Sequence, residues 1–274
     1  MKNFKIKCNN LEISNLDQFC LISGPCQIES EQHAIDIAGK INDIAKKNKI
    51  RYVFKSSFDK ANRTSLSSVR GLGLDSSLKV FEKIKKLFNL NILTDVHTNE
   101  QCSVVSNYVD ILQIPAFLCR QTDLLISAAK TNKVINIKKG QFLAPWDMKN
   151  VVNKIISTGN KQILLTERGS SFGYNSLVND MRSIPIMKET GYPVIFDATH
   201  SVQLPGGMGD KSGGQREFIL PLSKAAIAIG VAGIFVETHE DPDKAPSDGA
   251  NMLKINDLDN YIQELIQIDK VIKN

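Results

Sequence analysis

The chain contains 274 residues, of which 42% are apolar and 23% are charged, with 17 glycines and 9 prolines. This is the composition of an ordinary globular protein, so it excludes disordered, collagen-like and low-complexity classes. The formal net charge is only +5. No Lys/Arg-rich block forms a phosphate-binding stripe, so nucleic acid is not an expected partner.

The N-terminal segment and the cysteines bear on the cellular compartment. The chain begins with basic residues but lacks the apolar core of a signal peptide. No apolar run of about 18 residues occurs, so no membrane span is expected. The five cysteines are scattered and odd in number, which indicates free thiols and favours the reducing cytoplasm.

Short apolar runs rich in Val, Ile and Leu recur along the chain and predict strands. The predicted strands are Phe19–Gly24, Tyr52–Ser56, Ile92–Val96, Ile111–Ile114, Val134–Lys138, Gln162–Glu167, Val194–Ala198 and Ile234–Glu237. Several of them are apolar on both faces, as parallel strands covered by helices are. Segments with a period of about 3.6 residues lie between them and predict helices. These include Glu31–Lys47, Ser76–Phe88, Met148–Ser157, Glu217–Ile229 and a last helix at Asp257–Ile272.

The order of these elements predicts an α/β fold. Eight strand-then-helix units in about 250 residues favour a (β/α)8 TIM barrel, although the pattern leaves an open doubly wound sheet as an alternative. Before the first strand, Phe4–Lys7 and Glu12–Ile13 flank Asn9 and Asn10. We expect a short hairpin there, within residues 1–14, covering the N-terminal end of the barrel. No linker or repeat interrupts residues 1–274, so one domain is expected.

In such a barrel, catalytic groups lie at or just after the C-terminal ends of the strands. The polar side chains at these places are Cys26, Lys55, Lys60, Arg63, Asp95, His97, Gln113, Arg120, Lys138, Arg168, His200, Glu237, His239 and Asp248. The barrel would bring them to one mouth. Any one of them could instead cap a helix or pair with a local partner.

Six members of this set are cations, namely Lys55, Lys60, Arg63, Arg120, Lys138 and Arg168. Arg binds phosphate and carboxylate oxygens in a bidentate manner, whereas Lys acts as a point charge. Because crowded like charges repel, the cluster indicates ligands with more than one anionic group, such as two phosphorylated substrates. Alternatively, two or three of the six could be solvated or pair with Asp59, Asp95 or Glu167.

Four other members, Cys26, His200, Glu237 and Asp248, have the side-chain types that together bind one divalent metal. A thiolate and an imidazole suit zinc or ferrous iron, and carboxylates extend the choice to manganese. The four residues are far apart in the sequence, so spacing does not test the set. Cys26 could equally be a small buried apolar residue.

Longer motifs carry a family resemblance. They are Gly24–Ser30 (GPCQIES), Phe54–Arg63 (FKSSFDKANR), Thr94–His97 (TDVH), Gln113–Leu124 (QIPAFLCRQTDL), Asn136–Lys139 (NIKK), Glu167–Tyr174 (ERGSSFGY), Phe196–Ser201 (FDATHS) and Ser247–Gly249 (SDG). In order and over nearly the whole chain, they resemble the 3-deoxy-D-manno-octulosonate 8-phosphate synthases, also called 2-dehydro-3-deoxyphosphooctonate aldolases.

The resemblance implies a (β/α)8 barrel, typically a homotetramer, that condenses phosphoenolpyruvate with D-arabinose 5-phosphate and water. The products would be the eight-carbon sugar phosphate, used for lipopolysaccharide, and inorganic phosphate. The residues implied to bind phosphoenolpyruvate are Lys55, Lys60, Gln113, Lys138 and Arg168. Those implied for arabinose 5-phosphate are Asn62, Arg63, Thr64 and, from a neighbouring subunit, Arg120. Lys60, Asp95, Lys138 and His200 are the candidate catalytic residues.

Cys26 and the Ser247–Gly249 motif resemble the metal-dependent branch of this family. The resemblance therefore implies that Cys26, His200, Glu237 and Asp248 hold the metal. Related synthases that use erythrose 4-phosphate or N-acetylmannosamine are alternatives, although Lys60–Arg63 argues against both. A barrel that senses sugar phosphates without catalysis is an alternative from a different functional class.

Overall fold

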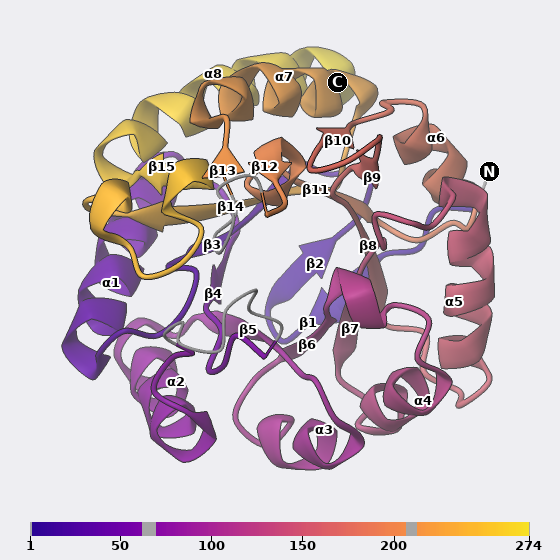
Figure 1. Ribbon diagram of the computed structural model, residues 1–274, viewed down its shortest axis with the longest axis horizontal. Coiled ribbons are helices and arrows are strands. Elements are labelled where there is room, and N and C mark those ends of the chain that lie inside the picture. Colours follow the sequence, from indigo (N-terminus) through magenta and orange to yellow (C-terminus); the bar gives the residue numbers. More distant parts are fainter. Residues whose placement is uncertain (1, 62–69, 207–212, 274) are drawn as a thin grey trace.

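A computed structural model describes residues 2–61, 70–206 and 213–273. Eight parallel strands lie in the order β11-β8-β7-β6-β5-β4-β3-β14, and β11 pairs with β14 to close the barrel. They are β3 (Cys20–Gly24), β4 (Tyr52–Lys55), β5 (Asn91–Asp95), β6 (Ile111–Ile114), β7 (Val134–Lys138), β8 (Ile163–Glu167), β11 (Val194–Asp197) and β14 (Gly233–His239). The predicted TIM barrel is confirmed, and the open sheet is excluded (Figure 1).

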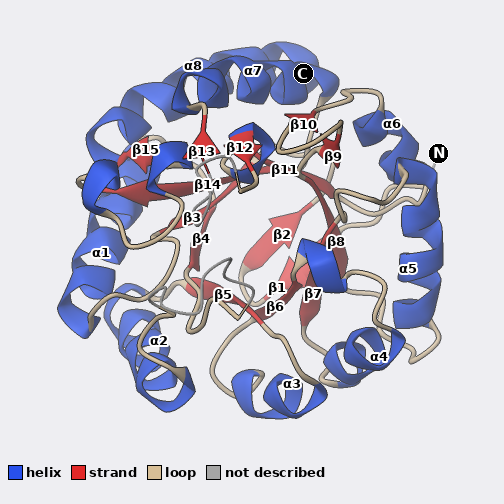
Figure 2. Cartoon of the chain, in the orientation of Figure 1, coloured by secondary structure: helices blue, strands red, loops and turns tan. Residues whose placement is uncertain are grey.

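Helices surround this ring of strands (Figures 1 and 2). They are α1 (Glu31–Lys47), α2 (Leu74–Phe88), α3 (Asn99–Val105), α4 (Thr122–Lys130), α5 (Met148–Ile156), α6 (Ser183–Lys188), α7 (Ile219–Ile229) and α8 (Leu258–Lys273). Every residue of the eight barrel strands is buried, as expected for strands covered on both faces. The predicted strands and helices are confirmed, with ends that differ by no more than two residues.

The N-terminal hairpin is also confirmed. It joins β1 (Ile6–Cys8) to β2 (Leu11–Ile13) in antiparallel pairing, and Asn9 adopts a positive φ of 52° in the turn. The amide of Asn9 donates to Asn91 Oδ1 at 2.7 Å and to Asp110 Oδ1 at 3.0 Å. Asn91 begins β5 and Asp110 precedes β6, so the hairpin lies against the N-terminal ends of the strands (Figure 1).

Shorter strands add to the C-terminal side of the barrel. Two pairs lie in the loops after β8 and β11, and one strand pairs in parallel beside the C-terminal end of β14. These are β9 (Ser170–Ser171) with β10 (Leu177–Val178), β12 (Gln203–Leu204) with β13 (Gly213–Gly214), and β15 (Leu253–Lys254). Among the described residues, we find no helix whose length and apolar character would let it cross a membrane.

A lysine at the end of α6 is unusual because it is partly buried. Lys188 Nζ donates to the carbonyl oxygen of Ile229, at the C-terminal end of α7, at 2.9 Å. Burial lowers the pKa of Lys188 to about 8, and the nearby charge of Lys273 acts in the same direction. The folded chain therefore binds fewer protons than the unfolded chain over the interval between the two pKa values.

We predict that this group makes stability rise with pH between about 8 and 10.5. The Lys188→Met variant lacks the titrating group. The free energy of unfolding of the wild type relative to that variant should therefore increase by about 1–2 kcal/mol over this interval. Urea unfolding at both ends of the interval measures the change. The exposed Lys161→Met variant is the control and should show no such increase; a constant difference for Lys188→Met would contradict the prediction.

Candidate active site

The C-terminal ends of the barrel strands bring the predicted polar residues together. Lys55, Asp95 and Lys138 are the last residues of β4, β5 and β7, and all three are buried. Arg168 directly follows β8 and is 4% exposed. Glu237 lies within β14 and has no exposed surface. The strand-end positions named from the sequence thus converge at one mouth, as the barrel fold requires.

The four predicted metal ligands form a compact cluster in this mouth. One ligand atom from each of Cys26, Glu237 and Asp248 lies within 4.8 Å of the others, and Cys26 Sγ donates to Asp248 Oδ2 at 3.2 Å. His200 Nε2 lies 3.9 Å from Asp248 Oδ2 and 4.0 Å from Glu237 Oε1. The other ring nitrogen of His200 is held by Asp197 at 2.9 Å, so Nε2 is the nitrogen that faces the cluster.

The chemistry of this cluster fits a divalent cation. Glu237 Oε2 is buried and has no hydrogen-bond partner among the described residues. Burying a carboxylate oxygen without a hydrogen-bond partner costs free energy unless a bound ligand pairs with it. Burial raises the pKa of the Cys26 thiol, and the carboxylate of Glu237 raises it further, so in this structure the thiol is protonated. A bound cation would take the place of that proton, because the thiolate is the form that binds metals.

Lys55 connects this cluster to the barrel interior. Its Nζ lies 2.5 Å from Glu237 Oε1 and donates to the carbonyl oxygen of Cys26 at 3.1 Å. Burial alone would raise the pKa of Glu237, but the ammonium of Lys55, with His200 and Lys60, lowers it to about 2. Glu237 is therefore anionic at neutral pH, which is the form that can bind a metal.

Asp197 holds two of the predicted residues and was not predicted itself. Lys138 Nζ donates to its Oδ2, and His200 donates its backbone N–H to Oδ1 at 2.9 Å. Lys138 Nζ also lies 3.4 Å from the ring centroid of Phe235, a cation–π contact. The sequence interpretation placed Asp197 inside a strand ending at Ala198. The available signal was its position as the last residue of β11, equivalent to those of Asp95 and Lys138.

Arg168 has an unused hydrogen-bond donor in the same mouth. Its Nη2 donates to Gln203 Oε1 at 2.9 Å, and Gln203 Nε2 donates to Asp248 Oδ1 at 3.1 Å. Its Nη1 is buried and without a partner among the described residues. Burial lowers the pKa of the guanidinium, partly offset by Asp197 and Asp248. A buried guanidinium with a free N–H is suited to an anionic ligand.

A series of side-chain hydrogen bonds links four neighbouring strands, β8, β7, β6 and β5. Thr166 donates to Asn136 Oδ1 at 2.7 Å, Asn136 donates to Gln113 Oε1 at 2.7 Å, and Gln113 donates to Asp95 Oδ1 at 2.5 Å. Ser57 donates to the other carboxylate oxygen of Asp95. Asn136 fixes the orientation of the Gln113 amide, which must present its oxygen to Asn136 and its nitrogen to Asp95.

The remaining predicted residues lie at the edge of the cluster or beyond the described chain. Lys60 is half-buried; burial lowers its pKa, but the negative charges of Cys26 in its thiolate form and of the carboxylates of Glu237, Asp95 and Asp248 outweigh this and raise it. Arg120 is exposed after the 3₁₀ helix Ala116–Leu118, so its side chain does not enter the buried cluster. The three residues expected to bind the sugar phosphate lie outside the described residues: Asn62, Arg63 and Thr64.

Two histidines of the predicted set lie apart from the metal cluster. His97 packs edge-on against Phe58, with 5.7 Å between ring centroids. His239 Nε2 lies 3.1 Å from Glu29 Oε1. The sequence left open that some of the six cations pair with Asp59, Asp95 or Glu167. In the structure Lys55 pairs instead with Glu237, and Glu167 pairs with Lys139, which is not one of the six.

The DAHP synthetase I family model matches residues 3–274 of the chain. The chain belongs to this family. A 2-dehydro-3-deoxyphosphooctonate aldolase from Bartonella henselae is 61% identical over 271 residues, covering 99% of this chain and 97% of that protein. The aldolase of Bartonella bacilliformis is 61% identical over 272 residues, with 99% and 96% covered, and that of Brucella anthropi is 58% identical over 271 residues, with 99% and 98% covered. The resemblance seen in the sequence is confirmed.

In this member of the DAHP synthetase I family, we predict that Asn136→Ala destabilises the barrel. The change leaves Thr166 Oγ1 without its acceptor and Gln113 Oε1 without its donor in a fully buried place. Each unsatisfied group costs about 1–3 kcal/mol, and urea unfolding measures the loss. The control is Asn153→Ala on the exposed face of α5, which should change stability by no more than about 0.5 kcal/mol. Equal effects of the two substitutions would show that the hydrogen bonds of Asn136 contribute nothing to the stability of the protein.

Proposed function

We propose that the chain is a 3-deoxy-D-manno-octulosonate 8-phosphate synthase. It condenses phosphoenolpyruvate with D-arabinose 5-phosphate and water, and releases inorganic phosphate and the eight-carbon sugar phosphate used in lipopolysaccharide biosynthesis. The observation that carries the proposal is the 61% identity, over 99% of the chain, to a protein named for this activity. The chemistry of the mouth supports it, because the substrates bring two phosphates and a carboxylate to a site rich in cations.

The proposed phosphoenolpyruvate site is made by Lys55, Lys60, Gln113, Lys138 and Arg168. Nη1 of Arg168 supports this assignment: it is buried and has no partner within the described part of the chain, and a phosphate or carboxylate oxygen would satisfy it. Lys55 pairs with the carboxylate of Glu237, and Lys138 pairs with that of Asp197. Their charges are therefore held in place before the substrate arrives. Preorganised cations of this kind stabilise the charge that develops on a leaving phosphate.

The proposed arabinose 5-phosphate site consists of Asn62, Arg63 and Thr64, with Arg120 from a neighbouring subunit of a homotetramer. The exposure of Arg120 supports a role toward another subunit. Large apolar side chains on the loops after β6, β7 and β8 support an oligomer: Phe117 is 54% exposed, Trp146 is 65% exposed and Phe172 is 73% exposed. Exposed apolar residues of this size gather at interfaces between proteins.

In the proposed reaction, carbon 3 of phosphoenolpyruvate forms a bond to the aldehyde carbon of the sugar, and water adds to carbon 2. Phosphate then leaves with cleavage of its C–O bond. Lys60, Asp95, Lys138 and His200 are the proposed catalytic residues. Burial raises the pKa of Asp95, but the charges of Lys55 and Lys60 lower it by more, so Asp95 is ionised at neutral pH. Gln113 and Ser57 hold its carboxylate in position.

We assign the divalent metal of the metal-dependent branch to Cys26, His200, Glu237 and Asp248. Zinc, ferrous iron and manganese all suit this donor set. The metal would supply Lewis-acid polarisation, or orientation, of a substrate oxygen or of water. Asp197 holds the Nδ1 proton of His200 and so leaves Nε2 available.

The five cysteines are free, which supports a reducing compartment such as the cytoplasm.

The substrate assignment predicts a clear preference among sugars. With phosphoenolpyruvate present, phosphate release should be at least about tenfold faster with arabinose 5-phosphate than with erythrose 4-phosphate or N-acetylmannosamine. A coupled phosphate assay and mass spectrometry of the sugar product measure this. A sample without any aldose controls for simple hydrolysis of phosphoenolpyruvate. Faster turnover of either other sugar would replace the proposal with one of the related synthases.

The metal assignment predicts that chelator-treated protein loses turnover and regains it when Zn²⁺, Fe²⁺ or Mn²⁺ is added. The loss should be at least about tenfold, because the cluster would lack the cation that orients its substrate. The Cys26→Ala variant ties the effect to this cluster, since added metal should restore it much less. The chelator presaturated with Ca²⁺ is the control for nonspecific effects. Full activity after complete removal of metal would place this chain outside the metal-dependent branch.

A further inference from the structure

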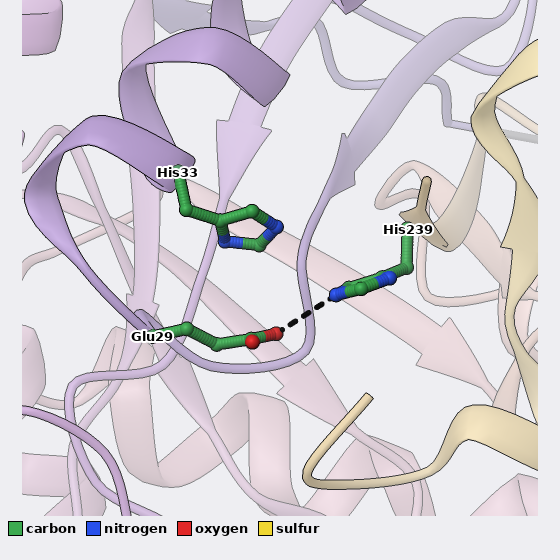
Figure 3. Close-up of side chains that lie close together, drawn as sticks. All are labelled: Glu29, His33 and His239. Atoms are coloured by element: carbon green, nitrogen blue, oxygen red, sulfur yellow. Dashed lines mark hydrogen bonds and ion pairs between the residues drawn. The ribbon is translucent and has the colours of Figure 1, made fainter. Parts of the chain in front are cut away.

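We infer that Glu29, His33 and His239 form a second divalent-metal site, separate from the cluster of Cys26 and its partners. One ligand atom from each of the three residues lies within 4.8 Å of the others (Figure 3). Two imidazoles and a carboxylate are a donor set for Zn²⁺ and chemically similar ions such as Co²⁺. Figure 3 shows the three side chains converging from three directions, as ligands around one ion would.

The backbone places these three side chains firmly. Ser30 caps α1 by accepting from the backbone N–H of His33 at 3.1 Å, which holds His33 in the first turn of the helix, and Glu29 directly precedes this cap. His239 is the last residue of β14, where it pairs with Lys254 of β15. Ligands carried by a helix start and a paired strand end need little rearrangement to bind an ion.

The contacts within the cluster leave one donor atom unused. His239 Nε2 lies 3.1 Å from Glu29 Oε1, His33 Nε2 lies 3.0 Å from Glu240 Oε2, and the two ring centroids are 5.0 Å apart. His33 Nδ1 is buried and has no partner among the described residues. A buried ring nitrogen without a partner, beside a second imidazole and two carboxylates, indicates a missing ligand.

The protons can be accounted for when an ion binds. The backbone N–H of Asp241 donates to His239 Nδ1 at 3.0 Å, so the neutral ring carries its proton on Nε2 and donates it to Glu29. Coordination through Nε2 moves this proton to Nδ1 and gives up the hydrogen bond from Asp241. The carboxylate of Glu240 lies 3.6 Å from Nδ1, and a small movement toward the ring would let it accept a hydrogen bond from Nδ1, as carboxylates commonly do beside metal-bound histidines.

The position of the site gives it a structural task. Glu29 lies three residues after Cys26, and His239 lies two residues after Glu237, so the same two segments supply ligands to both clusters. An ion bound by Glu29 and His239 would tie these segments together. A pocket of about 260 Å³ borders Glu29, with Gly71, Leu72 and Pro246 also in its lining.

Titration of the metal-free protein with Co²⁺ tests this inference. Cobalt on a thiolate gives a sulfur-to-cobalt charge-transfer band, whereas the second site has only nitrogen and oxygen donors. We expect the wild type to bind one equivalent of Co²⁺ that leaves this band unchanged. In His33→Gln and His239→Gln the affinity for that equivalent should fall by at least about 10–100-fold, or its binding should be lost. Calorimetry and metal analysis after gel filtration give the stoichiometry independently of enzyme activity.

His97→Gln is the matched control, because it removes a histidine of the mouth that belongs to neither cluster. It should keep the equivalent of cobalt that His33→Gln loses. Glu29→Gln keeps the size of the side chain and should weaken the same equivalent. Circular dichroism and thermal unfolding establish that each variant is folded. If the wild type binds cobalt only with the thiolate band, or if His33→Gln retains the second equivalent, the inference is wrong.

Discussion

Closure of eight parallel strands into a ring is the constraint on which the rest of the molecule depends. It requires β14 to fit between β11 and β3, with Gly233 opposite Ile195 and Cys20. A Cβ at Gly233 would lie 2.7 Å from Ile195 Cδ1 and 2.8 Å from the carbonyl oxygen of Cys20, so this pairing needs a residue without a side chain. Because all eight strands run the same way, closing the ring sets all their C-terminal ends around one mouth.

That geometry also explains how the interior tolerates buried charge. Lys55 of β4 pairs with Glu237 of β14, and Lys138 of β7 pairs with Asp197 of β11. In each pair one strand, β3 or β8, lies between the partners. Side chains from alternate strands of a TIM barrel form a common layer, so these partners meet across a strand rather than between neighbours. Each cation is thus neutralised locally while its position in the mouth is kept.

The sequence predicted the barrel and most of its strand-end residues, because apolar runs and helical periodicity are local signals. It did not name α3, α4 or α6; α3 and α6 have only seven and six residues, too few to show a clear helical period, whereas α4 is as long as α5, which was named. The partners within the mouth could not be predicted, since Lys55 and Glu237 are 182 residues apart and meet only through closure. Asp197 was missed although the signal was present, since it was the last residue but one of its predicted strand, just as the named candidate Asp95 was.

The two candidate metal clusters differ in chemistry but share their scaffold. The inner one, with Cys26 and Glu237, combines a thiol with carboxylates and the imidazole of His200; the outer one, with His239 and Glu29, has two imidazoles and no thiol, and fewer of its residues are buried. The connecting stretches are only three and two residues long, and one of them is paired strand. An ion bound at the proposed outer site would restrict the backbone that carries the inner ligands. By linkage, an ordered inner cluster favours the outer ion to the same degree.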